Sequence, residues 1–471
     1  MASFDQTGLN TMKTELLSPA GSLKNMRYAF AYGADAVYAG QPRYSLRVRN
    51  NEFNKLDIMA EAVAEAHAQN KRFYLASNIA PHNDKVRSYI RDLEPVIEMG
   101  PDALIMSDPG LIMLVKERWP EQRIHLSVQA NTVNWAAVKF WQQQGISRVI
   151  LSRELSIDEI EEIRQRCPDI ELEVFVHGAL CIAYSGRCLL SGYMTHRDSN
   201  QGACTNSCRW EYNVHPAKED DSGDLIPAQQ LDSHDKPSQS DAVETWEPVL
   251  LQERGRPGEY MPAYEDEHGT YIMNSKDLRA VQHVSRLVNM GIDSLKIEGR
   301  TKSHYYVART AAVYGRAIKE ALNGDEFDKG MMDELGALAN RGYTEGFYRR
   351  HVPAEYQSYE TGSAQPLKQQ YVAELISYDA QNHTVEMDVK NHFRIGDSLE
   401  LLSPSGSEHF ILDNLRTEKD EPLEVAAGSG RTVRINLPKN IPALTSKCYG
   451  LLVRDLSCLE ATSKQSVGRE K

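Results

Sequence analysis

The chain has 471 residues, of which 41% are hydrophobic and 25% are charged, and its formal net charge is −13. This composition is that of a folded protein with room for two or three domains, and it excludes an intrinsically disordered chain. No run of about eighteen apolar residues occurs, which argues against a transmembrane helix, and the first twelve residues lack the features of a secretory signal. We therefore expect a cytoplasmic protein with no membrane partner, which binds nucleic acid only through local basic patches.

Short apolar segments alternate with helical patterns between residue 15 and about residue 300, as βα units of a parallel sheet do. The predicted strands cover residues 15–20, 36–40, 72–78, 103–108, 123–129, 148–153, 171–178 and 294–300. Eight such strands favour an α/β fold of the TIM-like (β/α)8 barrel class over an open doubly wound sheet.

Capping residues predict where several of the intervening helices begin and end. Ser22 can cap the first helix, and Gly33 follows that helix where a left-handed residue is needed. Ser156 and Glu159 have the spacing of a capping box. After the eighth strand, apolar residues recur at helical spacing until Gly324, which predicts a long final helix.

Polar or charged residues end seven of the eight predicted strands. They are Ser18, Asn78, Asp108, Gln129, Arg153, His177 and Glu298. Since a barrel of this class has its active site at the C-terminal ends of its strands, we expect these side chains to line one functional site.

The chain is expected to divide into two domains. Residues 1–366 form the predicted catalytic barrel, with a flexible insertion at about 215–262, which is rich in Asp, Ser, Pro and Gln and has no sustained periodicity. In residues 367–471 apolar and polar residues alternate between turn signals. This pattern predicts a small antiparallel all-β domain, barrel-like or a sandwich, at the C-terminus.

Four of the seven cysteines lie in one short segment after the predicted seventh strand, with the spacing C-x6-C-x15-C-x3-C. They are Cys181, Cys188, Cys204 and Cys208. In a reducing compartment such clustered thiols are more often metal ligands than disulfides, and four thiolates can hold one zinc ion or one iron–sulfur cluster. Because structural zinc usually has two closely spaced pairs and only the last pair is close here, the spacing favours iron–sulfur.

Two alternatives stay open for these cysteines. They could be buried thiols without ligands, although their polar, glycine-rich surroundings are poor settings for core residues. Cys181 could instead be a nucleophile activated by His177, which would leave the other three cysteines without a role.

Three sequence blocks resemble the collagenase-like peptidase family U32. They are SPAGSLKNMRYAFAYGADAVYAG near the start, EVFVHGALCIAYSGRCLLSGY at the first cysteines and SLKIEGRTKSHYYVARTAAVYGRAI near residue 300. The resemblance covers the barrel and, more loosely, the C-terminal domain, and it leaves out the 215–262 insertion. Neither an HExxH motif nor a GxSxG elbow is present, so the sequence has no recognisable hydrolase motif.

The resemblance implies a tRNA-modifying enzyme that hydroxylates carbon 5 of the wobble uridine to 5-hydroxyuridine without O2. It implies prephenate as the oxygen-donating co-substrate and a [4Fe-4S] cluster held by the four clustered cysteines. The expected partners are then the tRNA anticodon loop, prephenate, an electron donor and iron–sulfur assembly proteins.

Given this reaction, the strand ends supply candidates for each role. His177 and Glu298 are the candidate catalytic acid or base. Two groups of residues are candidates for binding substrates. The candidate clamps for a dicarboxylate are the cations Arg43, Arg47, Arg153, Lys296 and Arg300. The candidates for reading a base edge are the amides Asn78 and Gln129. Asn131 could also read the base, while Tyr38 and Tyr44 could stack on it or, for Tyr38, simply pack in the barrel.

Other functions compete with this hypothesis. A peptidase would use rim carboxylates or a thiolate, and a non-catalytic scaffold would use a metal only to order residues 181–208. A hydroxylase could also act on ribosomal RNA or a quinone.

Overall fold

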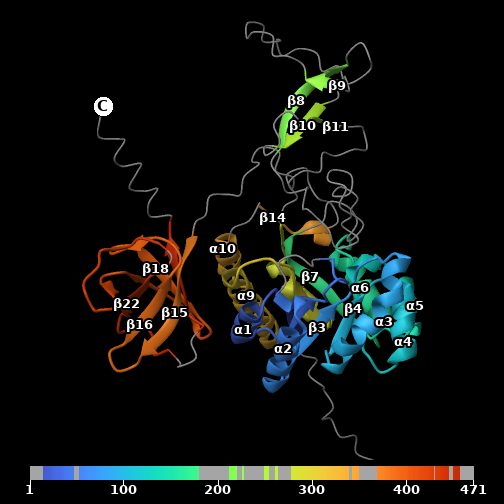
Figure 1. The fold of residues 1–471 in the computed structure, drawn as a ribbon, viewed down its shortest axis with the longest axis horizontal. Coiled ribbons are helices and arrows are strands. Elements are labelled where there is room, and N and C mark those ends of the chain that lie inside the picture. The colour runs from blue at the N-terminus through green and yellow to red at the C-terminus, as the bar shows by residue number, and fades with distance from the viewer. Residues whose placement is uncertain are drawn as a thin grey trace, which may run out of the picture.

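The computed structural model describes residues 14–46, 52–179, 277–338, 342–349, 369–428, 430–444 and 449–456, and the backbone of four strands between residues 212 and 263. A helix-covered barrel and an all-β domain make up most of this part (Figure 1).

The barrel consists of eight parallel strands, as the sequence predicts. They are β1 (Glu15–Pro19), β2 (Ala36–Gly40), β3 (Arg72–Ala76), β4 (Ala103–Met106), β5 (Ile124–Leu126), β6 (Arg148–Ile150), β7 (Glu171–Ala179) and β13 (Ser294–Ile297). They pair in this order, and β13 pairs with both β7 and β1, which closes the sheet on itself. The TIM-like fold class is thereby confirmed.

Several strands end earlier than the sequence predicts, so most of the polar residues at their predicted ends lie in the loops that follow. The strand predicted at 123–129 stops at Leu126, and the 3-10 turn η2 (Val128–Ala130) replaces its end. Asn131 after that turn has a left-handed backbone with φ of 50°. Such a conformation cannot continue a strand, because extended backbone needs negative φ.

Helices cover the outside of the barrel. They are α1 (Leu23–Ala31), α2 (Leu56–Ala68), α3 (Asn83–Glu98), α4 (Pro109–Arg118), α5 (Trp135–Gln143), α6 (Ile157–Arg166), α8 (Val284–Asn289), α9 (His304–Asn323) and α10 (Gly330–Gly336). The predicted caps are confirmed: Ser22 accepts a hydrogen bond from the amide of Asn25, Ser156 and Glu159 form a capping box, and Gly324 ends α9 with φ of 79°.

Short elements that the sequence pattern misses extend the sheet beside β7. β12 (Asp277–Arg279) pairs antiparallel with the end of β7, and β14 (Tyr343–Thr344) pairs with β12. The 3-10 turns η1 (Glu52–Asn54), η5 (Val281–His283) and η6 (Gly346–Arg349) complete the barrel domain's described elements. Segments of two to four residues are too short to show a period.

Regular backbone structure lies in the segment predicted as a flexible insertion, at about 215–262. A four-stranded antiparallel sheet in the order β11-β10-β8-β9 lies there. Its strands are β8 (Tyr212–Glu219), β9 (Leu225–Pro227), β10 (Val249–Glu253) and β11 (Tyr260–Ala263). Antiparallel pairing is made by backbone hydrogen bonds, so it does not require the alternation of apolar side chains that the prediction depended on.

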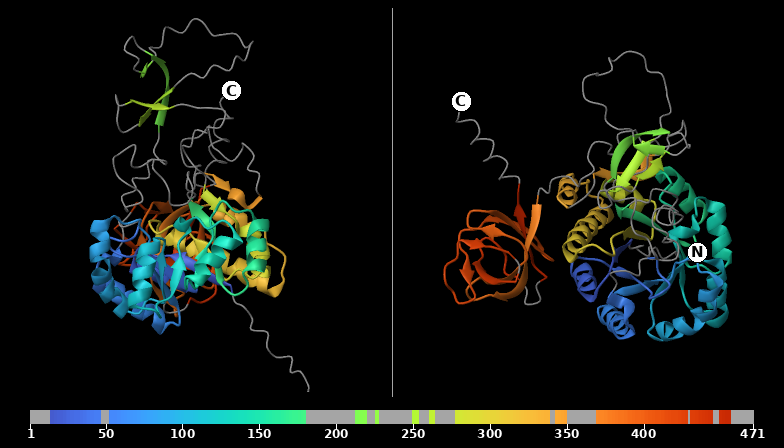
Figure 2. Two further views of the ribbon diagram at one scale, coloured as in Figure 1. Left: turned by 90° about the vertical axis from the view of Figure 1, so that its right-hand side faces the viewer. Right: turned by 45° about the horizontal axis from the view of Figure 1, so that its top comes forward.

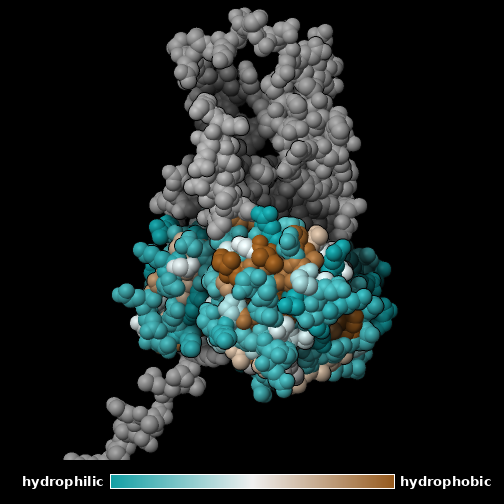
Figure 3. Space-filling model, turned by 90° about the vertical axis from the view of Figure 1, so that its left-hand side faces the viewer, coloured by the Kyte–Doolittle hydropathy of each residue, from teal (hydrophilic) through white to brown (hydrophobic). Residues whose placement is uncertain are grey.

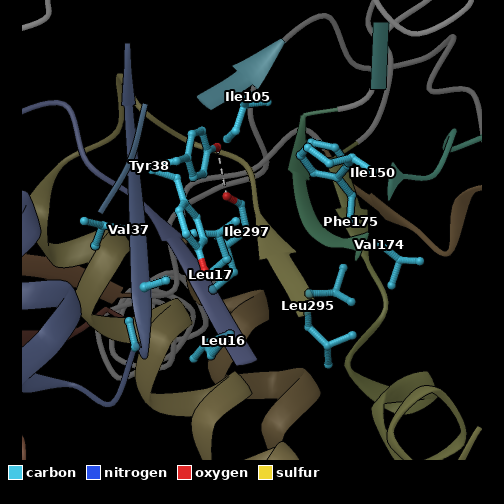
Figure 4. Packing of buried hydrophobic residues seen from close by; sticks show 14 of the residues in the cluster. Leu16, Leu17, Val37, Tyr38, Ile105, Ile150, Val174, Phe175, Leu295 and Ile297 are labelled. Carbon is cyan, nitrogen blue, oxygen red and sulfur yellow. Dashed lines mark hydrogen bonds between the residues drawn. The ribbon is translucent and has the colours of Figure 1, made fainter. Parts of the chain in front are cut away.

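Apolar side chains fill the space between the strands and the helices and part of the barrel interior (Figure 4). Leu16 on β1 and Leu295 on β13 are at most 1% exposed. Tyr38 on β2 reaches across to β13, where its hydroxyl donates to the carbonyl of Ile297 at 3.0 Å. This contact links β2 to β13 near the C-terminal end of the barrel.

The C-terminal domain is all-β and antiparallel, as predicted. Its strands are β15 (Gln369–Asp379), β16 (Thr384–Val389), β17 (Phe393–Arg394), β18 (Ser398–Ser403), β19 (Gly406–Ile411), β20 (Arg416–Thr417), β21 (Val425–Ala426), β22 (Thr432–Asn436) and β23 (Leu451–Asp455). Seven of them form one sheet in the order β19-β18-β23-β15-β16-β22-β20, which encloses a separate apolar core.

The C-terminal domain lies against helices α1 and α9 of the barrel (Figure 2). Arg309 of α9 makes two hydrogen bonds, of 2.7 and 2.6 Å, to the carboxylate of Glu400 on β18, and both side chains are buried. Tyr32, the C-cap residue of α1, donates to the carbonyl of Leu402 at 2.9 Å. On the side that this domain presents, the described surface is mainly hydrophilic, with a compact group of apolar side chains (Figure 3).

The helices in the described part of the chain include none with the length and hydropathy needed to span a membrane.

Candidate active site at the barrel mouth

Arg153 and Glu298 meet at the C-terminal end of the barrel. Nη2 of Arg153 lies 3.2 Å from Oε2 of Glu298, and Nη1 donates to the carbonyl of Ala179 at 2.9 Å. The guanidinium lies 3.8 Å from the centre of the Phe175 ring, within the range of a cation–π contact. Both charged side chains are largely buried, with 9% and 12% exposed, so their charges act in a poorly solvated setting.

A glycine makes this close approach between β7 and β13 feasible. Gly178 has φ of 102°, and a Cβ atom there would lie 2.5 Å from the carbonyl oxygen of Glu298. Glycine at position 178 is therefore required by packing as well as by backbone conformation.

Lys296 lies deeper in the barrel than Arg153. Its ammonium donates to Oε1 of Glu173 at 2.8 Å and lies 4.4 Å from the centre of the Tyr38 ring. Burial lowers the pKa of Lys296, and the neighbouring Glu173 carboxylate offsets part of this shift. The predicted residues Arg153, Lys296 and Glu298 thus share one region, with Phe175 in contact with both cations.

Below Lys296 the barrel interior is ionic, which sequence reasoning missed. Arg148 bonds to Glu15 at 2.6 Å and to Glu173 at 3.1 Å, and Tyr74 donates to Glu15 at 2.7 Å. Burial alone would raise the pKa of Glu15, but the charge and hydrogen bonds of Arg148 outweigh burial and lower it. The available signals are Glu15, Arg148 and Glu173, which are charged residues among the apolar residues of β1, β6 and β7.

The backbone carbonyl of His177 accepts from the amide of Glu298 at 2.9 Å, but the imidazole is enclosed by aromatic residues. Its Nδ1 is 3.2 Å from the hydroxyl of Tyr314 on α9, and the rings of Tyr306 and Tyr343 also surround it. Burial, with the nearby charges of Lys302 and Arg279, lowers the pKa of His177 to about 3. This setting favours a packing role for a neutral imidazole, and the catalytic role of His177 stays a prediction.

Asn78, Ser127 and Gln129 form a chain of polar groups across the ends of β3 and β5. The amide nitrogen of Asn78 lies 3.4 Å from Oγ of Ser127, which in turn donates to Oε1 of Gln129 at 3.0 Å. Oδ1 of Asn78 accepts from the backbone amide of Leu46 at 3.3 Å. The bond from the Leu46 amide fixes which atoms of the Asn78 amide face their neighbours. Since Oε1 of Gln129 is used, its NH2 group is the part that remains to donate elsewhere.

Two tyrosines predicted to stack on a base are buried instead. Tyr38 is 4% exposed and Tyr44 is 1% exposed, so neither presents a ring face to the mouth. For Tyr38 the packing alternative is confirmed. The hydroxyl of Tyr44 donates to Asp92 at 2.7 Å, and its ring packs edge-on against Tyr89.

The predicted arginines differ in their positions. Arg43 is exposed and pairs with Asp92 at 2.7 Å on the side of α3, outside the barrel interior. Arg300 is buried, and its Nη1 donates to Oγ of Ser45 at 2.9 Å. Arg47 and the cysteines at 181, 188, 204 and 208 lie outside the described residues.

The end of β7 shows where the cysteine segment starts. β7 ends at Ala179, whose carbonyl binds Arg153, and Cys181 is the second residue after it. Four thiols can ligate one iron–sulfur cluster, so this donor set fits a thiolate-ligated cluster chemically.

The barrel is closed and parallel, and paired ions and polar amides lie at the C-terminal ends of its strands. This is the arrangement of (β/α)8-barrel enzymes. Residues 21–358 match the model of peptidase family U32, and residues 368–445 match that of the peptidase family U32 C-terminal domain. The chain belongs to peptidase family U32, as its sequence blocks indicate.

Proteins with similar sequences include RNA-modifying proteins. The chain is 59% identical over 451 residues to tRNA hydroxylation protein P of Escherichia coli (strain K12), covering 94% of this chain and 97% of that protein. It is 58% identical over 449 residues to the protein of the same name from Haemophilus influenzae, covering 94% and 96%. It is 30% identical over 357 residues to the 23S rRNA 5-hydroxycytidine C2501 synthase of E. coli, covering 75% of this chain and 45% of that protein.

Proposed function

We propose that this protein is a tRNA hydroxylase that converts the wobble uridine to 5-hydroxyuridine without O2. Its co-substrate is prephenate, and it uses a [4Fe-4S] cluster. The observation that carries the proposal is the identity of 59% and 58%, over 94% of the chain, to two proteins named tRNA hydroxylation protein P. The wobble position, prephenate and the cluster are what the sequence resemblance implies.

The ion pair at the mouth offers a way to bind a carboxylate co-substrate. Arg153 already holds a carboxylate, that of Glu298, at 3.2 Å. A guanidinium binds carboxylates in a fixed planar geometry, so a carboxylate of prephenate can compete with Glu298 for Nη2. Oε2 of Glu298 could then accept a proton in place of the Arg153 contact, and Glu298 is the better candidate for the base because His177 is enclosed by tyrosines.

The amide chain offers a way to recognise the base. Uracil presents carbonyl acceptors where cytosine presents an amino donor at the equivalent position. Gln129, with its Oε1 held by Ser127, presents an NH2 donor, which matches a uracil carbonyl and repels the cytosine amino group. A wobble base is unpaired in the free tRNA, so its edge is accessible to such a side chain.

Cys181, Cys188, Cys204 and Cys208 would hold the cluster. When bound, it would supply electron transfer to the reaction. Arg153 connects the start of this segment to the proposed carboxylate site, because it bonds to both Ala179 and Glu298. The proposal also requires an electron donor and iron–sulfur assembly proteins as partners, and we propose that it acts in the cytoplasm.

Mass spectrometry of tRNA nucleosides tests the proposal. A strain that lacks this protein should lose 5-hydroxyuridine and the nucleosides derived from it. Wild-type protein should restore them, whereas Cys181→Ala and Glu298→Gln should not. Glu162→Gln, which neutralises an exposed carboxylate far from the mouth, is the matched control and should restore them.

Unchanged tRNA nucleosides in that strain would contradict the proposal. Loss of a hydroxylated ribosomal nucleoside or a quinone in their place would indicate a different hydroxylase substrate. Peptide hydrolysis by protein stripped of iron would favour the peptidase function that the family name implies.

A further inference from the structure

A pocket of about 690 Å³ lies between the start of α1, the turn η1 and the loop that follows β13. Its wall carries three cations, Lys55, Arg300 and Lys302, and one carboxylate, Glu52. The remaining wall combines polar and apolar groups and includes Gly21, Ser22, Asn25, Asn54, Ile58 and Thr301. The pocket is therefore positively charged within a chain whose net charge is −13.

The buried cation of this pocket is held in place by its surroundings. The guanidinium of Arg300 lies 5.9 Å from the Tyr38 ring centre, and its Nη1 bonds to Ser45 at 2.9 Å. A Cβ atom on Gly40 would lie 2.4 Å from that nitrogen, so only glycine leaves room for the guanidinium. Because Lys296 lies 4.4 Å from the same Tyr38 ring, the pocket adjoins the interior of the proposed active site.

Hydrogen bonds between distant segments shape the pocket wall. Nδ2 of Asn25 donates to the carbonyl of Lys302 at 3.0 Å, and the amide of Glu52 donates to the carbonyl of Gly21 at 3.0 Å. The Lys302 ammonium lies 5.3 Å from the Tyr306 ring centre, which limits its range of positions. The first turn of α1 adds the positive end of a helix dipole to the same wall.

On the basis of the proposed tRNA substrate, we propose that this pocket binds the phosphodiester next to the base that reacts. Arg, Lys, Ser, Thr and Asn side chains and helix N-termini are the groups that proteins use on nucleic-acid phosphates, and this wall contains all of them. The exposed rim residues Asn54, Lys55 and Thr301 leave the pocket open to solvent. An open rim suits a continuous strand better than a small dicarboxylate, which pockets usually enclose.

Binding of an anticodon stem–loop RNA to the full, cluster-loaded protein tests this site without requiring turnover. Lys55→Ala and Lys302→Ala should each weaken binding about tenfold, since each removes a charge-assisted contact. Each should also lower the slope of log affinity against log salt by about 0.7 to 1. The loss should be the same for stem–loops with uridine or cytosine at the wobble position, because a phosphate carries no base identity.

The matched control is Lys319→Ala, which removes one exposed lysine from α9 without touching the pocket. Its RNA affinity and salt slope should equal those of the wild type. Thermal unfolding by circular dichroism checks that all variants fold. Lys55 is exposed at the start of α2, so its removal is the variant least able to act through folding.

Pocket variants that bind RNA like the wild type would overturn the proposal. If they raise the prephenate concentration needed for half-maximal rate with RNA affinity unchanged, the pocket is a dicarboxylate site and the proposal is also overturned. If wild-type protein binds no tRNA at all, the proposed function fails first. If RNA binding depends on Lys55 and Lys302 but no hydroxylation occurs, the proposed phosphodiester site is supported and the proposed reaction is refuted.

Discussion

Replacing Arg148 with methionine removes the cation at the centre of the ionic barrel interior. The side chain is 2% exposed and pairs with Glu15, Glu171 and Glu173 at 2.6, 2.8 and 3.1 Å. Removing one partner of a buried ion pair typically destabilises a protein by about 3–5 kcal/mol. Glu15 keeps Arg72 and Glu173 keeps Lys296, so we expect the lower end, about 3 kcal/mol.

The pH dependence gives this prediction a definite sign. In the wild type the pKa of Glu15 is lowered, so its stabilising contribution is present above its unfolded-state pKa and is lost as pH falls through the folded-state value. In Arg148→Met the opposing effect of burial dominates and raises that pKa, so acidification stabilises the variant until the carboxyl is protonated. The stability difference between the two proteins should therefore be smaller at pH 4.5 than at pH 7.

Urea unfolding followed by circular dichroism at both pH values measures this difference. Arg166→Met is the control, since Arg166 is 51% exposed and pairs with Glu162 on the surface of α6, and it should change stability by less than about 0.5 kcal/mol. An Arg148→Met variant that loses no more stability than this control, or a difference that does not shrink on acidification, would refute the reasoning.

Three further predictions concern the domain junction, the enclosed histidine and the base-reading amide. Arg309→Met should lower the free energy of unfolding by about 3 kcal/mol because it leaves Glu400 buried without its bidentate partner, and adding Glu400→Leu should recover most of the loss in the same urea assay. His177 has its pKa lowered to about 3, so its neutral form stabilises the fold above pH 6.5 and this stability is lost as pH falls. Between pH 7 and pH 5, His177→Gln should thus lose about 2 kcal/mol less stability than the wild type, and equal losses would show that the imidazole is not enclosed. Gln129→Glu replaces a donor with an acceptor and should lower kcat/KM for uridine-containing tRNA by at least about tenfold, whereas an unchanged value would remove Gln129 from base recognition.

The strands and helices of the barrel are largely predictable because each repeats a local pattern. Ser156 with Glu159, and Gly324, mark helix ends by interactions within a few residues, and these predictions are confirmed. The pairs in the barrel interior are not predictable in this way. Arg148 and Glu15 are 133 positions apart, so only closure of the barrel makes a charged residue in an apolar strand recognisable as one half of an ion pair.

The candidate site is predictable in its location and less so in its members. Arg153, Lys296 and Glu298 come together because parallel strands place their C-terminal ends at one rim. Arg43 and Tyr44 follow β2 by only a few residues, yet the chain turns there and both interact with Asp92 on α3. The direction of a loop depends on contacts with other segments, which the sequence does not display.

The most direct test of the central claim is reconstitution with purified components under argon. Cluster-loaded protein, unmodified tRNA, prephenate and a reductant should yield 5-hydroxyuridine at the wobble position, detected by mass spectrometry of the digested tRNA. Omission of prephenate or replacement of the wild type with Cys181→Ala should abolish the product. If the product forms only when O2 is admitted, or if no hydroxylated uridine forms although the cluster is loaded and tRNA is bound, the account is contradicted.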